Sequence, residues 1–296
     1  MRTGGEWAAK VGKKTKNSYL CGRIQKRTMK RKSPYLFGKA GALRPLAAFL
    51  LLLSLLLPVS CAQGKVRNYR LQVVKDYPHD EQSYTQGLFF HEGGMYETTG
   101  QYGESSLRKV DLATGKALKR FDFDAKYFVE GSVVLDGNLY ILTWKNKVAF
   151  VYDAATLAYK STARYPREGW GLTTDGKSLI ASDGSSRLYF MDGSFQVKKT
   201  VTVTMNGRNV NMLNELEWID GKVWANVYLT DMIVIINPSS GAVEATVDCT
   251  GLLPARLRDA RTDVLNGIAF DPVSKKIYLT GKYWKKLYEV ELVEKK

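Results

Sequence analysis

Five polar or aromatic side chains occupy one recurring position in this sequence. They are Gln86, Glu130, Trp170, Asn214 and Asn266, and each directly precedes a segment of similar pattern. These segments begin with GLFF, GSVV, GLTT, ELEW and GIAF, at spacings of 44, 40, 44 and 52 residues. Copies that fold alike around a ring would bring the five side chains to one axis. A carboxylate, three amides and an indole gathered there form a candidate active site that can bind a polar substrate and move a proton.

Glu130 is the candidate for proton transfer. It lies between aromatic and apolar neighbours in the segment YFVEGSVV. A carboxylate in such a partly dry setting has a raised proton affinity, which suits proton transfer near neutral pH. The alternative is a glutamate that only accepts backbone N–H bonds at the centre of the fold. Gln86, Asn214 and Asn266 have the same alternative, as hydrogen-bonding struts in a central channel.

A second set of residues follows the first at a fixed distance. Fourteen residues after three of the recurring positions stand Trp144, Gly184 and Tyr228, and Lys282 falls near the equivalent place in the last copy. Together with Trp170, these residues would form an aromatic-walled pocket that contains one cation. The alternative for any of the aromatic residues is packing between strands of a sheet.

The remaining composition limits the chemistry. Only two histidines are present, His79 and His91, and neither stands in a ligand pattern, so histidine-rich metal sites and histidine-based triads are not expected. Both are expected at the surface or in turns. Three cysteines are too few for a disulfide framework, and Cys249 is expected to be a small buried apolar side chain. No glycine-rich phosphate loop occurs. We therefore expect neither a metal nor a cofactor.

The repeat spacing also predicts the fold. A period of about 40 to 50 residues with several short strands per unit is typical of a β-propeller, in which each repeat forms one four-stranded sheet. Asp-Gly pairs between apolar runs, as at 136–137 and 220–221, indicate hairpins. The fifth copy ends one strand short, and a strand-like run at 66–77 precedes the first copy. We expect these two ends to pair, because pairing removes two open sheet edges.

The prediction is therefore an all-β fold. Residues 65–296 would form a single five-bladed β-propeller whose ring is closed by an N-terminal strand. The segment 250–264 breaks the rhythm of strands and is expected to be a short helix or a rim loop.

Residues 1–64 differ in composition from the rest of the chain. Residues 1–46 carry 13 Lys and Arg against the single acid Glu6, which accounts for +12 of the net charge of +15. The basic balance therefore belongs to this leader and indicates no nucleic-acid partner. An uncharged apolar stretch at about 45–57 is short for a membrane span and suits the core of a signal peptide. Met29 is an alternative start to Met1.

Cys61 directly follows this apolar stretch, in PVSC. Bacterial lipoprotein signals place the acylated cysteine at such a position, so lipidation of Cys61 is expected, with simple cleavage near Ala62 as the alternative. We expect an exported monomer, either in the periplasm or lipid-anchored to the cell envelope of a bacterium, with no other membrane contact.

Ten segments resemble one known family, the plant and bacterial type of glutaminyl cyclase. The resemblance covers essentially all of 66–296 in order, and the segments are TQGL (85–88), YGESSLRKVDLATG (102–115), EG (130–131), LTWK (142–145), EGWGLTTDG (168–176), SDGS (182–185), LNELEW (213–218), WANVY (224–228), LNGIAFD (265–271) and TGKYWKKLYEV (281–290). It implies a five-bladed propeller and a glutaminyl-peptide cyclotransferase. This enzyme converts the N-terminal glutamine of a peptide or protein to pyroglutamate and releases ammonia. The type is unrelated to the zinc-dependent animal enzyme.

The resemblance also implies a role for individual residues. The family's acid/base glutamate falls on Glu130, and its polar substrate contacts fall on Gln86, Asn214 and Lys282. The aromatic wall falls on Tyr84, Phe128, Trp144 and Trp170. Tyr228 stands where the family commonly has tryptophan, a replacement that keeps a flat apolar face and adds a hydroxyl. The segment FVEG replaces the more usual FGEG.

Two other classes of function remain alternatives. One is a non-catalytic propeller that binds peptides or a cell-envelope partner through the same channel. The presence of both Glu130 and Lys282 disfavours it. The other is a metal-dependent, lactonase-like propeller, which would need several inward-facing acids, whereas the five recurring positions supply only one.

Overall fold

The computed structural model describes residues 65–296. The expectations for the leader, the signal peptide, the start at Met29 and the lipidation of Cys61 lie outside the described residues. Within 65–296 the fold is all-β, as predicted, with 22 strands and one short 3₁₀ turn, η2 (Ala255–Leu257). No helix in this part of the chain is long and apolar enough to cross a membrane.

Three sheets have four strands each and follow the chain as simple meanders, in which each strand pairs with the next in sequence. Their tight hairpins arise where the sequence predicted them: Asp136 and Gly137 both have positive φ, 50° and 70°, as a two-residue turn of this type requires. The strands are β2 (Thr85–His91), β3 (Gly94–Thr99), β4 (Ser106–Val110) and β5 (Ala117–Asp122); β6 (Val129–Leu135), β7 (Asn138–Thr143), β8 (Val148–Asp153) and β9 (Tyr159–Arg164); and β10 (Leu172–Thr174), β11 (Leu179–Ala181), β12 (Arg187–Met191) and β13 (Val197–Thr202).

The other large sheet has eight strands and contains both ends of the described chain. In it β1 (Arg67–Pro78) pairs antiparallel with the last strand and parallel with β19, so the expected pairing of the two ends is present. A small hairpin that the sequence did not predict, formed by β14 (Thr204–Met205) and β15 (Arg208–Asn209), lies in the chain just before β16. The remaining strands are β16 (Leu213–Ile219), β17 (Lys222–Val227), β18 (Met232–Ile236), β19 (Val243–Asp248), β20 (Leu265–Asp271), β21 (Lys276–Gly281) and β22 (Lys286–Glu294).

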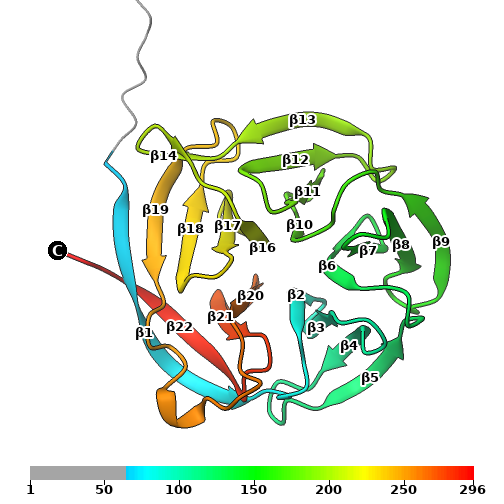
Figure 1. Ribbon diagram of the computed structural model, residues 1–296, viewed down its shortest axis with the longest axis horizontal. Coiled ribbons are helices and arrows are strands. Elements are labelled where there is room, and N and C mark those ends of the chain that lie inside the picture. The colour runs from blue at the N-terminus through cyan, green and yellow to red at the C-terminus, as the bar shows by residue number, and fades with distance from the viewer. Residues whose placement is uncertain (1–64) are drawn as a thin grey trace, which may run out of the picture. The chain divides into compact units, whose positions relative to one another are not determined.

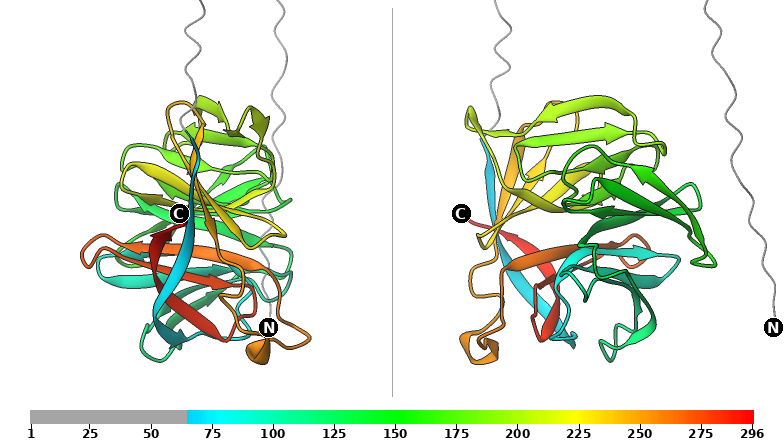
Figure 2. Two further views of the ribbon diagram at one scale, coloured as in Figure 1. Left: turned by 90° about the vertical axis from the view of Figure 1, so that its left-hand side faces the viewer. Right: turned by 45° about the vertical axis from the view of Figure 1, so that its right-hand side comes forward.

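The sheets stand around a common centre. Figure 1 shows β2, β6, β10, β16 and β20 nearest that centre. In side view, β1 runs along the outside of the molecule beside β22 (Figure 2). Five apolar clusters fill the spaces between consecutive groups of strands, and the fifth joins β20–β22 to β2–β3. Burial between the groups, rather than within any one, therefore holds them together.

The innermost strands approach one another too closely for most side chains. A Cβ on Gly131 would lie 2.5 Å from the backbone nitrogen of Leu172, and one on Gly87 would lie 2.8 Å from that of Ser132. Glu215 is the exception at this position. Its carboxyl accepts backbone N–H bonds from Leu88 (3.4 Å) and Ile268 (2.9 Å), in two other inner strands. The Glu215 side chain thus connects three of the inner strands, and the glycines at the equivalent positions of the other copies leave room for it.

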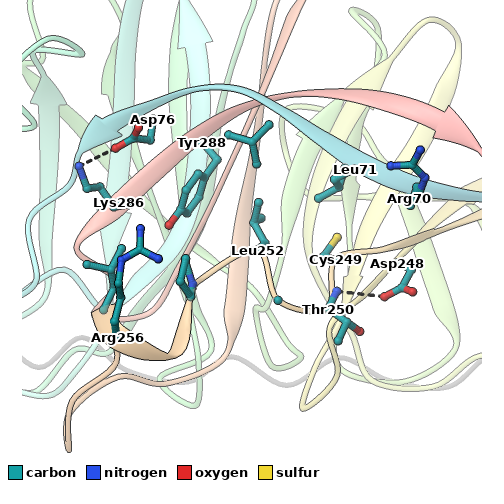
Figure 3. A pocket seen from close by; sticks show the side chains of 14 residues that line it. Arg70, Leu71, Asp76, Asp248, Cys249, Thr250, Leu252, Arg256, Lys286 and Tyr288 are labelled. Atoms are coloured by element: carbon teal, nitrogen blue, oxygen red, sulfur yellow. Dashed lines mark hydrogen bonds and ion pairs between the residues drawn. The ribbon is translucent and has the colours of Figure 1, made fainter.

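Away from the axis, β1 and β19 diverge after Arg70 and Asp248, where their pairing ends. A cavity of about 610 Å³ opens in this wedge beside the segment that carries η2 (Figure 3). Cys249 lies at its edge, 3% exposed and with its thiol free, so the prediction of a buried apolar cysteine is confirmed. The segment 250–264 is a rim loop with one 3₁₀ turn, as expected.

Candidate active site

The nine residues that the family resemblance assigned to catalysis and substrate binding line a single pocket, whereas Asn266 and Gly184 do not line it. Its volume is about 300 Å³, and a tenth lining residue, Gln101, was not predicted. The lining residues are Tyr84, Gln86, Gln101, Phe128, Glu130, Trp144, Trp170, Asn214, Tyr228 and Lys282.

Strand register explains why these residues meet. In an antiparallel pair, the start of one strand lies beside the end of the next, so Val129 pairs with Thr143 and Leu213 pairs with Val227. Glu130 and Asn214 directly follow Val129 and Leu213, and Trp144 and Tyr228 directly follow the paired residues Thr143 and Val227. In four of the five copies the pairing shifts at this point, which marks a β-bulge. A bulge locally bends the strand and redirects its side chains, and in three of these four copies the redirected residue (Gln86, Glu130 or Asn214) lines the pocket.

An unbroken ring of contacts surrounds the pocket. Aromatic residues make two arcs, and one cation and one anion join them. The distances between aromatic centroids are 6.0 Å for Tyr84–Phe128, 5.4 Å for Phe128–Trp144 and 5.6 Å for Trp170–Tyr228. The Lys282 Nζ joins the ends of the two arcs, at 4.9 Å from the Tyr228 centroid and 4.5 Å from the Tyr84 centroid. Glu168 connects Trp144 to Trp170.

Glu168 makes that connection with one atom. Its Oε2 accepts the indole N–H of Trp144 at 2.9 Å and that of Trp170 at 3.3 Å. Sequence reasoning gave Glu168 no role, although the residue opens the motif EGWG, which carried part of the family resemblance.

Glu130 is 4% exposed, and its carboxyl accepts no hydrogen bond from the residues that the structure describes. Burial raises the pKa of Glu130 well above its usual value. The Lys282 ammonium opposes this rise, and the Glu168 carboxylate adds to it. Glu130 is therefore a proton acceptor of raised affinity that lines the pocket, and among residues 65–296 its carboxyl interacts with Lys282 and Glu168 through charge and not through a hydrogen bond.

Lys282 provides the positive charge of the pocket and is 3% exposed. Burial lowers its pKa, while the carboxylates of Glu130 and Asp263 oppose the change. The two tyrosine rings beside its ammonium interact favourably with a cation. Within the described part of the chain, the Lys282 ammonium makes these ring contacts and no side-chain hydrogen bond, so its N–H groups can meet a ligand oxygen.

The amides differ in what they contact. Asn266 donates from Nδ2 to the Thr85 carbonyl (2.8 Å) and to Gln86 Oε1 (3.2 Å), and it does not line the pocket, so it is a strut. Because the Gln86 oxygen is occupied, its NH₂ group is the part available to a ligand. Asn214 lines the pocket and is 2% exposed.

Tyr84 and Tyr228 are walls with weak acidity. Burial raises the pKa of both phenols, and Asp263 adds to each rise. Both hydroxyls therefore remain protonated at neutral pH. Gly184, which belongs to the second set of positions, must be glycine for two reasons. Its φ is 77°, and a Cβ there would lie 2.7 Å from the Trp170 indole.

The expectation for His79 was wrong. Its side chain is 5% exposed and forms an ion pair with Glu97 at 3.0 Å, while its Nδ1 lies 2.7 Å from the Trp284 carbonyl oxygen. Burial alone would lower the pKa of His79, but Glu97, the Trp284 carbonyl and Asp80 together outweigh burial, and the pKa is raised. The ion pair joins the segment before Tyr84 to β3, and the contact with the Trp284 carbonyl joins it to the segment after Lys282. His91 has a side chain 25% exposed, near the surface as expected.

Within 65–296, no group of three or more His, Cys, Asp or Glu side chains is arranged to hold a metal ion. The pocket instead combines a proton acceptor, a cation and amide donors inside an aromatic wall. Such a set can bind a small polar group, stabilise negative charge on an oxygen and move a proton.

Known proteins are similar to this chain in sequence and in fold. The model of the glutamine cyclotransferase family matches residues 46–292. A glutaminyl-peptide cyclotransferase of Arabidopsis thaliana is 41% identical over 227 residues, which are 75% of this chain and 71% of the relative. The crystal structure of Myxococcus xanthus glutaminyl cyclase matches with a TM-score of 0.73 at 32% identity, covering 78% of this chain and 100% of that one. The chain belongs to the glutamine cyclotransferase family.

Proposed function

We propose that this protein is a glutaminyl-peptide cyclotransferase, an acyltransferase that converts an N-terminal glutamine to pyroglutamate and releases ammonia. Family membership supports the reaction. The observation that carries it in this chain is the buried Glu130 carboxyl, which faces the pocket with Lys282 and without a hydrogen bond from any described residue.

The proposed architecture is a five-bladed propeller formed by residues 65–296. The support is the succession of three four-stranded meanders and one eight-stranded sheet, which divides into β16–β19 and β20–β22 with β1. The five clusters between consecutive groups fit a closed ring. The pocket would then occupy one mouth of the central channel, where ligands commonly bind in folds of this kind.

The substrate supplies both reacting groups, so the enzyme must orient them and move protons. The α-amine attacks the side-chain carboxamide carbon, a C–N bond forms in a five-membered ring, and the tetrahedral intermediate expels ammonia. An α-amine has a reference pKa of about 7.7–8.0, so an appreciable fraction is neutral and able to attack at neutral pH. A carboxylate of raised pKa can accept one proton from this neutral amine as the C–N bond forms. Glu130 takes that proton during attack and returns it to the departing nitrogen, which leaves as NH₃.

Charge on the carboxamide oxygen needs donors in fixed positions. Lys282 and the NH₂ groups of Gln86 and Asn214 are the candidates, and all three are nearly buried. Preorganised donors in a dry site stabilise a developing oxyanion more than water does. The aromatic wall holds the aliphatic stem of glutamine and excludes the water that would otherwise give glutamate.

We propose that this reaction needs no metal, because the substrate provides its own nucleophile and Glu130 carries the proton. Activity should therefore survive dialysis against strong chelators. Loss of activity that zinc restores would contradict this step. Restoration by calcium would assign an ion to structure rather than to chemistry.

The location of the protein is proposed from sequence alone. Residues 1–64 would direct export, and Cys61 would carry the lipid that anchors a monomer to the envelope. Mass spectrometry of the mature protein tests this. An acylated N-terminal peptide that begins at Cys61 is expected, and a mature protein that retains residues 1–60 would contradict it.

The test of function is ammonia release from a dipeptide with N-terminal glutamine. The matched control is the N-acetylated dipeptide, whose blocked amine cannot attack. Ammonia and a pyroglutamyl product from the free dipeptide alone are expected. Binding of the free dipeptide without turnover would favour the non-catalytic alternative instead.

A further inference from the structure

We propose that Glu168 is a positioning residue that clamps the two tryptophans of the pocket wall and sets the working range of the acid/base Glu130. This inference rests on the proposed cyclotransferase reaction. It assigns a role to a side chain that lies outside the residues lining the pocket.

The clamp follows from the hydrogen bonds. Trp144 comes just after β7 and Trp170 just before β10, so the two indoles belong to different sheets. No ring contact joins them among the described aromatic pairs, and the Glu168 Oε2 is the atom that bridges their N–H groups. A charged acceptor makes stronger hydrogen bonds than a neutral one. The carboxylate therefore fixes both indole planes at once.

The backbone around Glu168 holds it in place. The next residue, Gly169, donates its N–H to the carbonyls of Thr143 (3.1 Å) and Trp144 (3.3 Å). A Cβ on Gly169 would lie 2.6 Å from the Leu142 Cβ, so only glycine allows the segment to lie this close to the end of β7. Glu168 is thereby anchored to the strand that carries the first of its two partners.

Glu168 also acts on Glu130 through charge. The groups that face Glu130 electrostatically are Lys282 and Glu168, which have opposite signs, and the phenols of Tyr84 and Tyr228. The negative charge of Glu168 disfavours a second negative charge on Glu130 and so raises the pKa of Glu130. Lys282 and Glu168 thus shift the pKa of Glu130 in opposite directions: Lys282 lowers it and Glu168 raises it.

Two substitutions separate the two effects. Glu168→Gln keeps an oxygen that can accept the indole N–H groups and removes the charge. Its KM should stay within about twofold, and the acidic limb of its pH profile should move to lower pH, because the Glu130 carboxylate becomes easier to form. Glu168→Leu removes the acceptor as well. Its KM should rise by about threefold to tenfold, which corresponds to the loss of an ordinary hydrogen bond.

Glu291→Gln is the matched control, because Glu291 is an exposed glutamate on β22. The proposal is overturned if the pH profile of Glu168→Gln coincides with that of Glu291→Gln, or if Glu168→Leu binds substrate as tightly as the wild type. Tryptophan emission provides a readout that needs no turnover: Glu168→Leu should change it, and Glu291→Gln should not. If the wild type releases no ammonia while the emission still changes, the proposed function fails and the clamp stands.

Discussion

Replacing His79 by alanine should strongly destabilise the fold. The imidazole pairs with the Glu97 carboxylate at 3.0 Å, and the two side chains are only 5% and 2% exposed. Without the imidazole, the buried Glu97 keeps its hydrogen bonds from Ser83 and Thr85 and the influence of Arg108 but loses its ion-pair partner. Breaking a buried ion pair by removing one partner costs about 3–5 kcal/mol. For a domain of this size, each kcal/mol corresponds to roughly 2–4 °C in Tm. The expected fall in Tm is therefore on the order of 6–20 °C.

The chain offers its own control in His91. That residue is near the surface, and its contact with Glu92 is 3.9 Å long and involves a carboxylate 80% exposed. Exposed pairs of this kind contribute little, so His91→Ala should leave the Tm nearly unchanged. The assay is thermal unfolding of both variants at pH 6.

The pH dependence of this difference has a definite sign. The pKa of His79 is raised above its ordinary value of 6.5, so its contribution is fully present below about pH 6.5. It is lost as the pH rises through the folded-state pKa. The gap between wild type and His79→Ala should therefore narrow at alkaline pH. The reasoning is refuted if His79→Ala and His91→Ala unfold at the same temperature.

Two further predictions concern Glu217, a buried glutamate on β16, and Tyr228, which stands where the family commonly has tryptophan. Burial raises the pKa of Glu217 to about 8, so this group should destabilise the fold progressively as the pH rises from about 4.5 to 8, and Glu217→Gln should remove that dependence. Urea midpoints at pH 5 and pH 9 measure this, and parallel changes in wild type and variant would contradict it. Tyr228→Phe should keep kcat, because the phenol stays protonated and acts as a wall, whereas Tyr228→Ala should mainly raise KM. Steady-state kinetics decide, and a loss of kcat in Tyr228→Phe as severe as in Glu130→Gln would show that the hydroxyl transfers protons.

The inner strands and most of the pocket could be predicted from the sequence because both follow strand register. Glu130 is the second residue of β6 and Trp144 directly follows β7, and the residues before them, Val129 and Thr143, pair across the two strands. A constant spacing in sequence therefore becomes a constant position in space. The all-β class and the pairing of the chain ends follow from the same periodicity. No comparable rule governs the rim, where the hairpin β14–β15 was missed.

The residues that sequence reasoning overlooked depend on contacts between separate segments. Glu168 owes its importance to indoles on two different sheets, and His79 owes its burial to Glu97 and to the Trp284 carbonyl, 205 residues away. Trp170 lies in the same motif as Glu168, but the second indole, from Trp144, and the partners of His79 cannot be predicted from local pattern. Gln101 did leave a signal, because it directly follows Gly100, which stands fourteen residues after Gln86 in the second set of positions.

The most direct test of the account is the Glu130→Gln variant. The amide nearly matches the carboxyl in size but cannot accept and return a proton at neutral pH. Ammonia release from a dipeptide with N-terminal glutamine should fall by at least about a hundredfold, the lower range for general acid–base catalysis. The variant should unfold at the wild-type temperature or above it, because the substitution removes a buried ionisable group that makes no hydrogen bond to the described chain. Turnover near the wild-type rate in this folded variant would contradict the assignment of Glu130 as the proton carrier.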